Sequence, residues 1–219
     1  MPQISEQQGI DKVGERVNIV RAVPSLAASF WSQVATLHRQ EIRGGFLSSL
    51  NPRFLESIYR SIARGDKAFL LAATDTKSAR VLGFICGSTD SRRTLMQCLS
   101  HSGIGLFFAV LPNACSFQTV RKMFESVRYA SARPSDTLPR AEILNFCVDR
   151  NVQGQGIGRL LFSALRTEFR DRGVQSIKIV TGASQEKAQR FYRAMNAQLV
   201  DEVEVHKGTG SLIFVYSLD

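Results

Sequence analysis

Several kinds of segment are absent from this chain of 219 residues, and each absence excludes a class of protein. No apolar run approaches the roughly 18 residues that a membrane-spanning helix needs. Residues 1–16 lack the basic start and apolar centre of a signal peptide, so we expect them to form a mobile polar tail. No run of five basic residues occurs, and no basic stripe carries interleaved aromatic residues. The sequence therefore predicts a globular protein without a transmembrane segment.

Residues that form metal sites and disulfides are also scarce. The four cysteines are scattered, no C-x-x-C pair occurs, and the chain has three histidines. This pattern argues against a zinc site and against a disulfide framework. We therefore expect no bound metal, and we expect a reducing, cytoplasmic setting.

The charge, in contrast, is strongly biased to one sign. The net charge is +9 and the isoelectric point is near 9.8. Such a bias is typical of proteins that bind nucleic acid, an anionic membrane surface or a phosphorylated small molecule. Because the basic residues are dispersed along the chain, we favour a solvated surface that attracts a small polyanion over a nucleic-acid partner.

The most informative stretch is a glycine-rich junction between an apolar run and a helical pattern. The apolar run Ile143–Val148 ends in a polar turn, and Gly154, Gly156 and Gly158 follow at alternate positions. Apolar residues then recur at the i, i+3, i+4 spacing of one buried helix face, until Gly173 is expected to end the helix. The pattern predicts a strand, a glycine loop and a helix.

A junction of this kind is suited to binding an anion. The first N–H groups of a helix have no partner within the helix, and they lie at the positive end of its dipole. Glycines let a phosphate approach the backbone closely. Two nucleotide motifs fail on spacing: a dinucleotide fingerprint needs glycine where Arg159 or Leu161 stands, and the G-K-[ST] of a P-loop is absent. A glycine-rich turn without a ligand is the alternative.

The spacing that does match is Gln/Arg-x-x-Gly-x-Gly/Ala, here Gln153–Gly158, and it resembles the GNAT acetyltransferase superfamily. The resemblance implies that the loop binds the pyrophosphate of acetyl-coenzyme A and that the preceding strand binds the pantetheine arm. The residues that it assigns to the coenzyme are Phe146, Cys147, Val148, Gln153, Gly154, Gln155, Gly156, Ile157, Gly158, Arg159 and Gln185.

The predicted order of elements agrees with the same family. We expect strands at 17–23, 68–74, 81–88, 141–148, 176–181, 199–205 and 212–218, and helices beginning near Pro24, Asn51, Ile157 and Ser184. The fold class is α/β, as an α+β mixed sheet: the GNAT acyl-CoA acyltransferase fold, a splayed central mixed sheet flanked by helices. One domain is expected over 17–219.

Residues 89–140 depart from the compact family pattern and are predicted to be a helical insertion. Their role is open among a lid over the acceptor site, a homodimer contact, a membrane-surface contact and ordinary packing, which we favour. Alternation along the strand at 141–148 predicts two faces. One face carries Glu142, Leu144, Phe146 and Val148, and the other carries Ile143, Asn145 and Cys147.

Two residues are candidates for proton transfer. The run Ala188–Asn196 resembles the second family signature, A-x-x-F-Y-x-x-x-G, and this implies that Tyr192 protonates the departing thiolate. The alternative is a core tyrosine on the helix's apolar face. Glu142 opens the strand beside the coenzyme and is the candidate general base; the alternative is a glutamate at a strand end in solvent. Cys147 is interpreted as structural because direct transfer needs no nucleophile.

Three positions depart from the family pattern. Arg150 stands where proline is frequent, which predicts a less rigid loop; Gln185 replaces an asparagine that contacts the coenzyme arm; and Ala197 replaces an aromatic residue. The resemblance implies an N-acetyltransferase that moves an acetyl group from acetyl-CoA to a primary amine by direct transfer. The acceptor is a small molecule or a peptide. The alternative is a non-catalytic module that senses acyl-CoA or binds nucleic acid.

Overall fold

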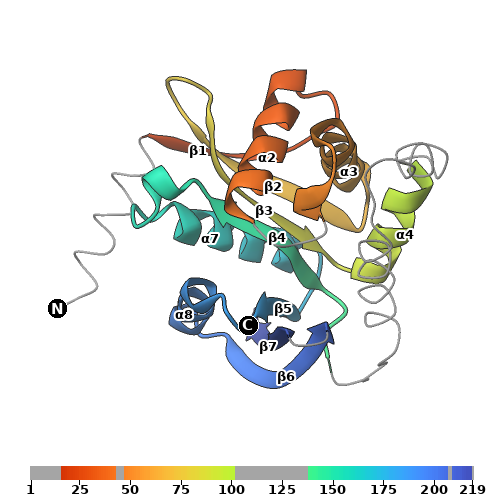
Figure 1. The fold of residues 1–219 in the computed structure, drawn as a ribbon, viewed down its shortest axis with the longest axis vertical. Helices are drawn as coiled ribbons and strands as arrows, with labels where there is room; N and C mark the ends of the chain where they lie inside the picture. Colours follow the sequence, from red (N-terminus) through yellow and green to blue (C-terminus); the bar gives the residue numbers. More distant parts are fainter. Residues whose placement is uncertain (1–15, 43–46, 102–137, 207–208, 219) are drawn as a thin grey trace.

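The fold is known from a computed structural model, which describes residues 16–42, 47–101, 138–206 and 209–218 (Figure 1). The predicted tail, apart from Arg16, and positions 102–137 of the predicted insertion lie outside the described residues. The first part of the insertion is described, and it contains the helix α4 (Ser91–His101). The predicted extent of the insertion and its role both stay predictions.

A seven-stranded sheet forms the centre of the molecule, with the strand order β1-β2-β3-β4-β5-β7-β6. Every neighbouring pair is antiparallel except β4 and β5, which are parallel. The sheet is therefore mixed, as predicted. The strands are β1 (Val17–Arg21), β2 (Ala68–Asp75), β3 (Val81–Ser88), β4 (Glu142–Val148), β5 (Ser176–Gly182), β6 (Gln198–His206) and β7 (Thr209–Ser217).

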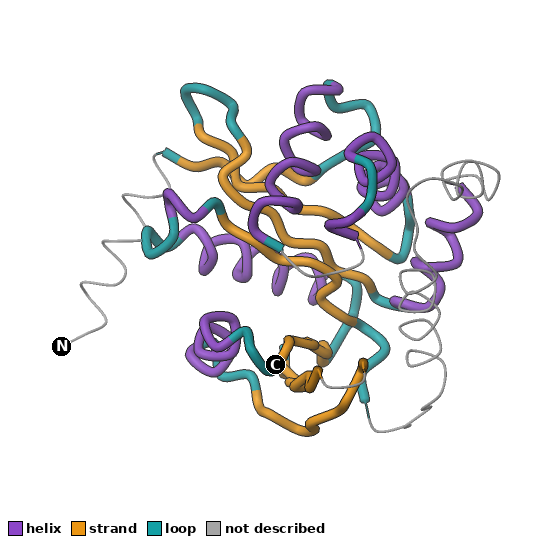
Figure 2. The backbone as a smooth tube through the Cα atoms, in the orientation of Figure 1, coloured by secondary structure: helices purple, strands orange, loops and turns teal. Residues whose placement is uncertain are grey.

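Helices cover both faces of this sheet (Figures 1 and 2). On one face α2 (Ala28–Glu41) and α3 (Pro52–Arg64) bury a core built around Trp31, Tyr59 and Phe84. On the other face α7 (Ile157–Asp171) and α8 (Glu186–Ala194) bury a second, more aromatic core. Two short 3-10 helices, Leu47–Ser49 and Arg150–Val152, complete the described helices.

Local signals in the sequence explain several element ends. The side chain of Asn51 accepts a hydrogen bond from the backbone N–H of Arg53 at 3.0 Å, and Pro52 is the first residue of α3, as predicted. Gly173 and Asn196 follow their helices with φ of 70° and 66°. Both values lie in the left-handed region, which glycine and asparagine tolerate better than other residues, and Gly173 ends its helix as predicted.

Two predicted helix starts are wrong. The helix predicted from Pro24 begins at Ala28, because residues before it form a turn in which the N–H of Leu26 donates to the carbonyl of Val23 at 3.0 Å. Ser184 does not cap α8 either. The residue before α8 is Gln185, whose side chain makes no capping hydrogen bond.

The strand β4 differs from the predicted alternation at one point. Pairing with β3 skips from Asn145 to Ile143, so Leu144 forms a β-bulge. The bulge turns Ile143 to the α7 and α8 side, where Phe146 and Val148 also pack, and it turns Leu144 to the α2 and α3 side with Cys147. The predicted faces are therefore wrong for Ile143 and Leu144, because an extra residue reverses the side of every residue beyond it.

The neighbouring strands β4 and β5 part soon after they meet. Their register contains two pairs, Glu142 with Lys178 and Ile143 with Ile179. Beyond Ile143, β4 continues to pair with β3 as far as Val148 but has no ladder with β5. The predicted splay is therefore confirmed, and it leaves one backbone edge of β4 facing a gap.

Candidate active site

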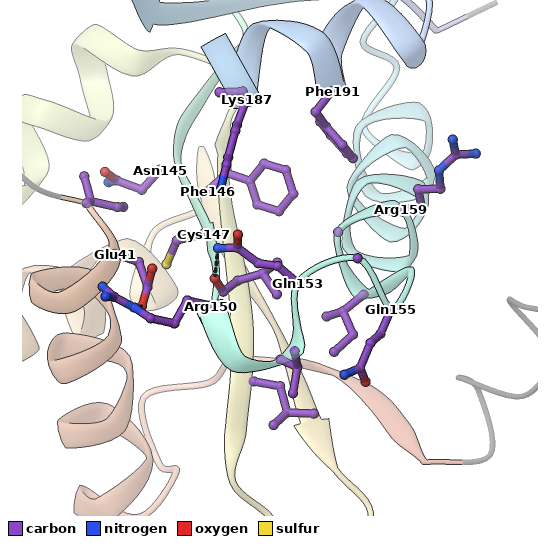
Figure 3. Close-up of a pocket in the computed structure, with 18 of the residues that line it drawn as sticks. Glu41, Asn145, Phe146, Cys147, Arg150, Gln153, Gln155, Arg159, Lys187 and Phe191 are labelled. Atoms are coloured by element: carbon purple, nitrogen blue, oxygen red, sulfur yellow. Dashed lines mark hydrogen bonds and ion pairs between the residues drawn. The ribbon is translucent and has the colours of Figure 1, made fainter. Parts of the chain in front are cut away.

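An open groove of about 2440 Å³ lies where β4 and β5 part. Its walls are β4 from Ile143 to Val148, the glycine loop with the start of α7, and the start of α8 with Tyr192 (Figure 3). Each residue that the sequence assigned to the coenzyme lines this groove, and so does Tyr192. Glu142 does not line it. The fold thus brings together segments that are up to about 50 positions apart in the sequence.

The glycine loop has the backbone shape of an anion cradle. Gly154 and Gly156 have φ of 79° and 86°, and Gly156 precedes the first residue of α7. Residues other than glycine rarely adopt these φ angles, so the backbone conformation of the loop requires glycine at both positions. Gly158 is different, because an added Cβ would lie 3.5 Å from the rings of Phe146 and Phe191 at ordinary contact distance. Gly158 is therefore not required by its backbone conformation.

Hydrogen bonds hold the loop in this shape. Asp149 accepts from the backbone N–H of Asn151 at 2.9 Å and from its amide at 2.8 Å, and it pairs with Arg80 at 3.1 Å. The amide nitrogen of Gln153 donates to the carbonyl of Val148 at 2.9 Å (Figure 3). The first-turn N–H groups of α7 are therefore presented by a loop that is already ordered.

Arg150 also contributes to this order. Its guanidinium pairs with Glu41 at 2.9 Å and donates to the carbonyl of Gln40 at 3.1 Å. These contacts fasten the loop to the end of α2. The sequence predicted that arginine in place of proline would make the loop less rigid. That prediction did not take into account the contacts of Arg150 with α2, which restrain the loop.

The two glutamines at the start of α8 form hydrogen bonds with the backbone of the turn between β5 and α8. The side-chain Oε1 of Gln185 accepts a hydrogen bond from the backbone N–H of Gly182 at 3.3 Å. The Gln189 amide donates to the carbonyls of Gly182 and Ala183 at 3.1 and 2.8 Å. Gln185 lines the groove, but its side-chain oxygen is engaged in the turn between β5 and α8.

Tyr192 lies within an aromatic cluster and at the edge of the groove at once. Its ring centroid is 5.5 Å from that of Phe191 and 6.3 to 6.4 Å from those of Phe146, Phe162 and Phe214. The residue is 5% exposed, and burial raises its pKa above the ordinary value of 10.0. The phenol is therefore protonated at neutral pH and able to donate.

Glu142 lies at the point where β4 and β5 still pair. Its carboxylate is 3.1 Å from the ammonium of Lys178, and the two side chains are 19% and 21% exposed. Neither residue lines the groove. The structure therefore places the predicted base in an ion pair outside the groove.

The sequence analysis did not identify Glu41, which is a shielded carboxylate in the groove. Three acidic residues line the groove: Asp75, Glu186 and Glu41. The Asp75 carboxylate accepts hydrogen bonds within its own turn, and Glu186 is 75% exposed. The Glu41 side chain is 11% exposed and faces Cys147 on β4 (Figure 3). In the sequence Glu41 stands in the last turn of a helix, and no motif there indicates that it would line a groove.

Cys147 has the properties of a buried thiol. Burial raises its pKa, and the nearby Glu41 carboxylate raises it further. A thiol in this state is a poor nucleophile at neutral pH. The structural interpretation of Cys147 agrees with this environment.

Metal and membrane features are absent from the part of the chain that the structure describes. No three His, Cys, Asp or Glu side chains gather there as a metal site would require. Within the same residues, no helix has the length and apolar character to cross a membrane.

The chain matches the family model of the Acetyltransferase (GNAT) family over residues 31–197. It belongs to this family. The assignment confirms the resemblance read from the glycine loop and the Tyr192 helix, and it favours an enzyme over a non-catalytic module. No curated protein matches the chain.

Solved structures agree on the GNAT fold. The chain is similar to PH1933 from Pyrococcus horikoshii, with a TM-score of 0.57, 14% identity and coverage of 92% of this chain and 98% of the other. It is similar to Arabidopsis thaliana NAA60 in complex with acetyl-CoA, with a TM-score of 0.56, 14% identity and coverage of 92% and 98%. For the ribosomal-protein-S18-alanine N-acetyltransferase of Escherichia coli the TM-score is 0.54, with 12% identity and coverage of 92% and 95%. At these identities the likeness establishes the fold alone.

Proposed function

We propose that this GNAT acetyltransferase moves the acetyl group of acetyl-CoA directly to a primary amine of a small molecule or peptide. The observation that carries the proposal is the parting of β4 from β5 beside an ordered glycine loop. This arrangement offers a backbone edge and a helix N-terminus to the same elongated ligand. Acetyl-CoA has both complementary parts, an amide-bearing arm and a diphosphate.

The groove fits this coenzyme by ordinary backbone chemistry. Backbone groups on the edge of β4 that faces the gap can pair with the amides of the pantetheine arm, as an added strand would; the carbonyl of Val148 already accepts from the Gln153 amide. The first N–H groups of α7 can donate hydrogen bonds to the diphosphate, because the left-handed Gly154 and Gly156 carry no side chain over them. The arm then runs from the loop toward the bulge at Leu144, and the thioester lies along β4.

Tyr192 is the proposed proton donor to the departing thiolate. Its raised pKa keeps the phenol protonated across the neutral range, and it lines the groove next to Phe146. A thiolate that leaves in an apolar environment needs a proton or a hydrogen bond, because burial of an unpaired charge is costly.

The proton of the acceptor amine needs a carboxylate, and two are candidates. Glu142 was predicted from the sequence, but its carboxylate is paired with Lys178 outside the groove. Glu41 lines the groove, is shielded from solvent and is oriented by Arg150. We therefore favour Glu41 as the group that binds the acceptor ammonium and accepts its proton, with Glu142 as the alternative.

The two carboxylates can be separated by one pair of variants. Thiol release from acetyl-CoA is first measured with a panel of primary amines, including a peptide with a free α-amino group, a polyamine and an aminoglycoside. With an accepted amine, Glu41→Gln should lower kcat/KM by about 100-fold or more, because the amide cannot accept the proton of the amine. Glu142→Gln should affect the rate much less. The opposite ranking of the two variants would assign the base to Glu142.

Tyr192→Phe tests the proton donor. The variant keeps the ring in the aromatic cluster, so the fold and the affinity for acetyl-CoA should be retained while kcat falls. A loss of kcat that disappears when the leaving thiol is made more acidic would support proton donation. Unchanged turnover with a folded variant would leave Tyr192 as a core residue.

A further inference from the structure

The cations that line the groove differ in whether they already have an anionic partner. Six basic residues line it, and three of them form ion pairs with carboxylates at 2.9 to 3.3 Å. A paired guanidinium has much of its charge neutralised and is less available to an incoming anion. The three pairs are Arg80 with Asp149, Arg150 with Glu41, and Arg190 with Glu186.

Lys187 differs from these arginines. It lies in the first turn of α8, it is exposed, and among the residues that the structure describes it has no ion-pair partner. Figure 3 shows its side chain extending from α8 into the groove, toward the side where Phe146 and Gln153 lie. In the same view Arg159 extends from α7 away from β4. The inward-pointing cation thus comes from the wall opposite the glycine loop.

The neighbouring Gln185 is less available to a ligand in the groove than Lys187 is. It occupies the position from which the family's asparagine is expected to reach the coenzyme, but its oxygen accepts a hydrogen bond from Gly182. Lys187 is two residues further along and has a longer side chain that is not held in the turn. It is therefore the side chain of this first turn that is free to reach a ligand in the groove.

We propose that the Lys187 ammonium binds the diphosphate of acetyl-CoA from the wall opposite the glycine loop. The inference rests on the proposed function and deepens it, because it makes the diphosphate a requirement for donor recognition. The N–H groups of the loop contact the diphosphate on one side, and the ammonium contacts it on the other. Charge-assisted hydrogen bonds of this kind are stronger than neutral ones, and they lose strength as salt is added.

The test is coenzyme binding, which needs no knowledge of the acceptor. Dissociation constants for acetyl-CoA and for 3′-dephospho-acetyl-CoA are measured by calorimetry for the wild-type protein, Lys187→Ala and Lys187→Arg. The matched control is Lys67→Ala, which removes the same charge from a half-buried lysine that lies outside the groove and is paired with Asp66. Acetyl-pantetheine, which lacks every phosphate of the coenzyme, is compared by the shift that it causes in melting temperature.

The expected result is a roughly tenfold weaker binding of acetyl-CoA by Lys187→Ala, equivalent to about 1.4 kcal/mol. The same factor should appear with 3′-dephospho-acetyl-CoA, and Lys187→Arg should restore most of the affinity. Lys67→Ala should bind as the wild type does, and the shift caused by acetyl-pantetheine should be equal in the wild type and in Lys187→Ala.

Three results would overturn the assignment. Equal affinities for Lys187→Ala and the wild type would show that the ammonium does not contact the coenzyme. A deficit that vanishes with 3′-dephospho-acetyl-CoA would move the contact to the 3′-phosphate. A deficit that persists with acetyl-pantetheine would move it to the pantetheine arm. Failure of the wild-type protein to bind acetyl-CoA at all would instead refute the proposed function, and it is visible in the first titration.

Discussion

Mild acid should destabilise this protein through one buried residue of α2, His38. Its Nδ1 atom forms a hydrogen bond with the hydroxyl of Tyr59, and its Nε2 atom is buried without a partner among the described residues. The side chain is 1% exposed. Burial lowers the pKa of His38 from 6.5 to about 4, because the charged imidazolium would lose its hydration.

The sign of the effect follows from proton uptake. With a folded pKa of about 4 and an unfolded value of 6.5, the unfolded chain binds a proton before the folded chain does. Stability is therefore complete above the unfolded pKa and falls as the pH drops toward the folded one. Linkage between these two values gives a loss of about 2 kcal/mol between pH 7 and pH 5.

Urea unfolding at a series of pH values measures this loss directly. His38→Gln retains a hydrogen-bonding group near Tyr59 and does not titrate, so it serves as the matched variant. Carboxylates titrate alike in both proteins, and the difference between their pH dependences isolates His38. If the wild-type protein and His38→Gln lose the same free energy of unfolding between pH 7 and pH 5, the assignment of a low pKa to His38 is refuted.

Four further substitutions test the site. Gly156→Ala should lower the free energy of unfolding by about 1 to 2 kcal/mol, because its φ of 86° strains a residue with a Cβ. Gly158→Ala should lower it much less in the same urea titration, because the added Cβ would make ordinary contacts at 3.5 Å and Gly158 has no positive φ. Arg150→Ala should lower the free energy of unfolding by about 1 to 2 kcal/mol, because it leaves the Glu41 carboxylate, which is 11% exposed, without its cation. It should also lower kcat/KM for the accepted amine, because the Glu41 carboxylate loses the guanidinium that orients it; an unchanged kcat/KM would count against Glu41 as the base. Gly83→Ala would place a Cβ 2.9 Å from the carbonyl oxygen of Cys147. Displacement of β4 should then cost about 1 to 3 kcal/mol and weaken acetyl-CoA binding, whereas wild-type affinity would show that β4 accommodates the methyl group.

Features that depend on neighbours in the sequence could be predicted well. The start of α3 follows from Asn51 and Pro52, and its cap is a contact between residues two positions apart. The ends at Gly173 and Asn196 follow from the left-handed angles that these residue types tolerate. The glycine loop belongs to the same class, because the shape of its backbone depends on where its glycines stand.

Features that depend on the partner strand could not be read from alternation. The bulge at Leu144 arises in the pairing of β4 with β3, and nothing in the residues 142–148 marks the extra position. Its effect is large, because it decides that Ile143 faces α7 and that Leu144 faces α2. Alternation along one strand cannot show which residue the neighbouring strand skips when the two strands pair.

The sequence by itself determined the family and the order of the elements, because these depend on short motifs and local periodicity. The tertiary structure alone decided which acidic side chains line the groove. Glu41 meets Arg150 across 109 positions of sequence, and Glu142 is withdrawn from the groove by Lys178 on the next strand. Which carboxylate faces the groove depends on how α2, β4 and β5 pack together, and such long-range contacts leave no pattern in either segment taken alone.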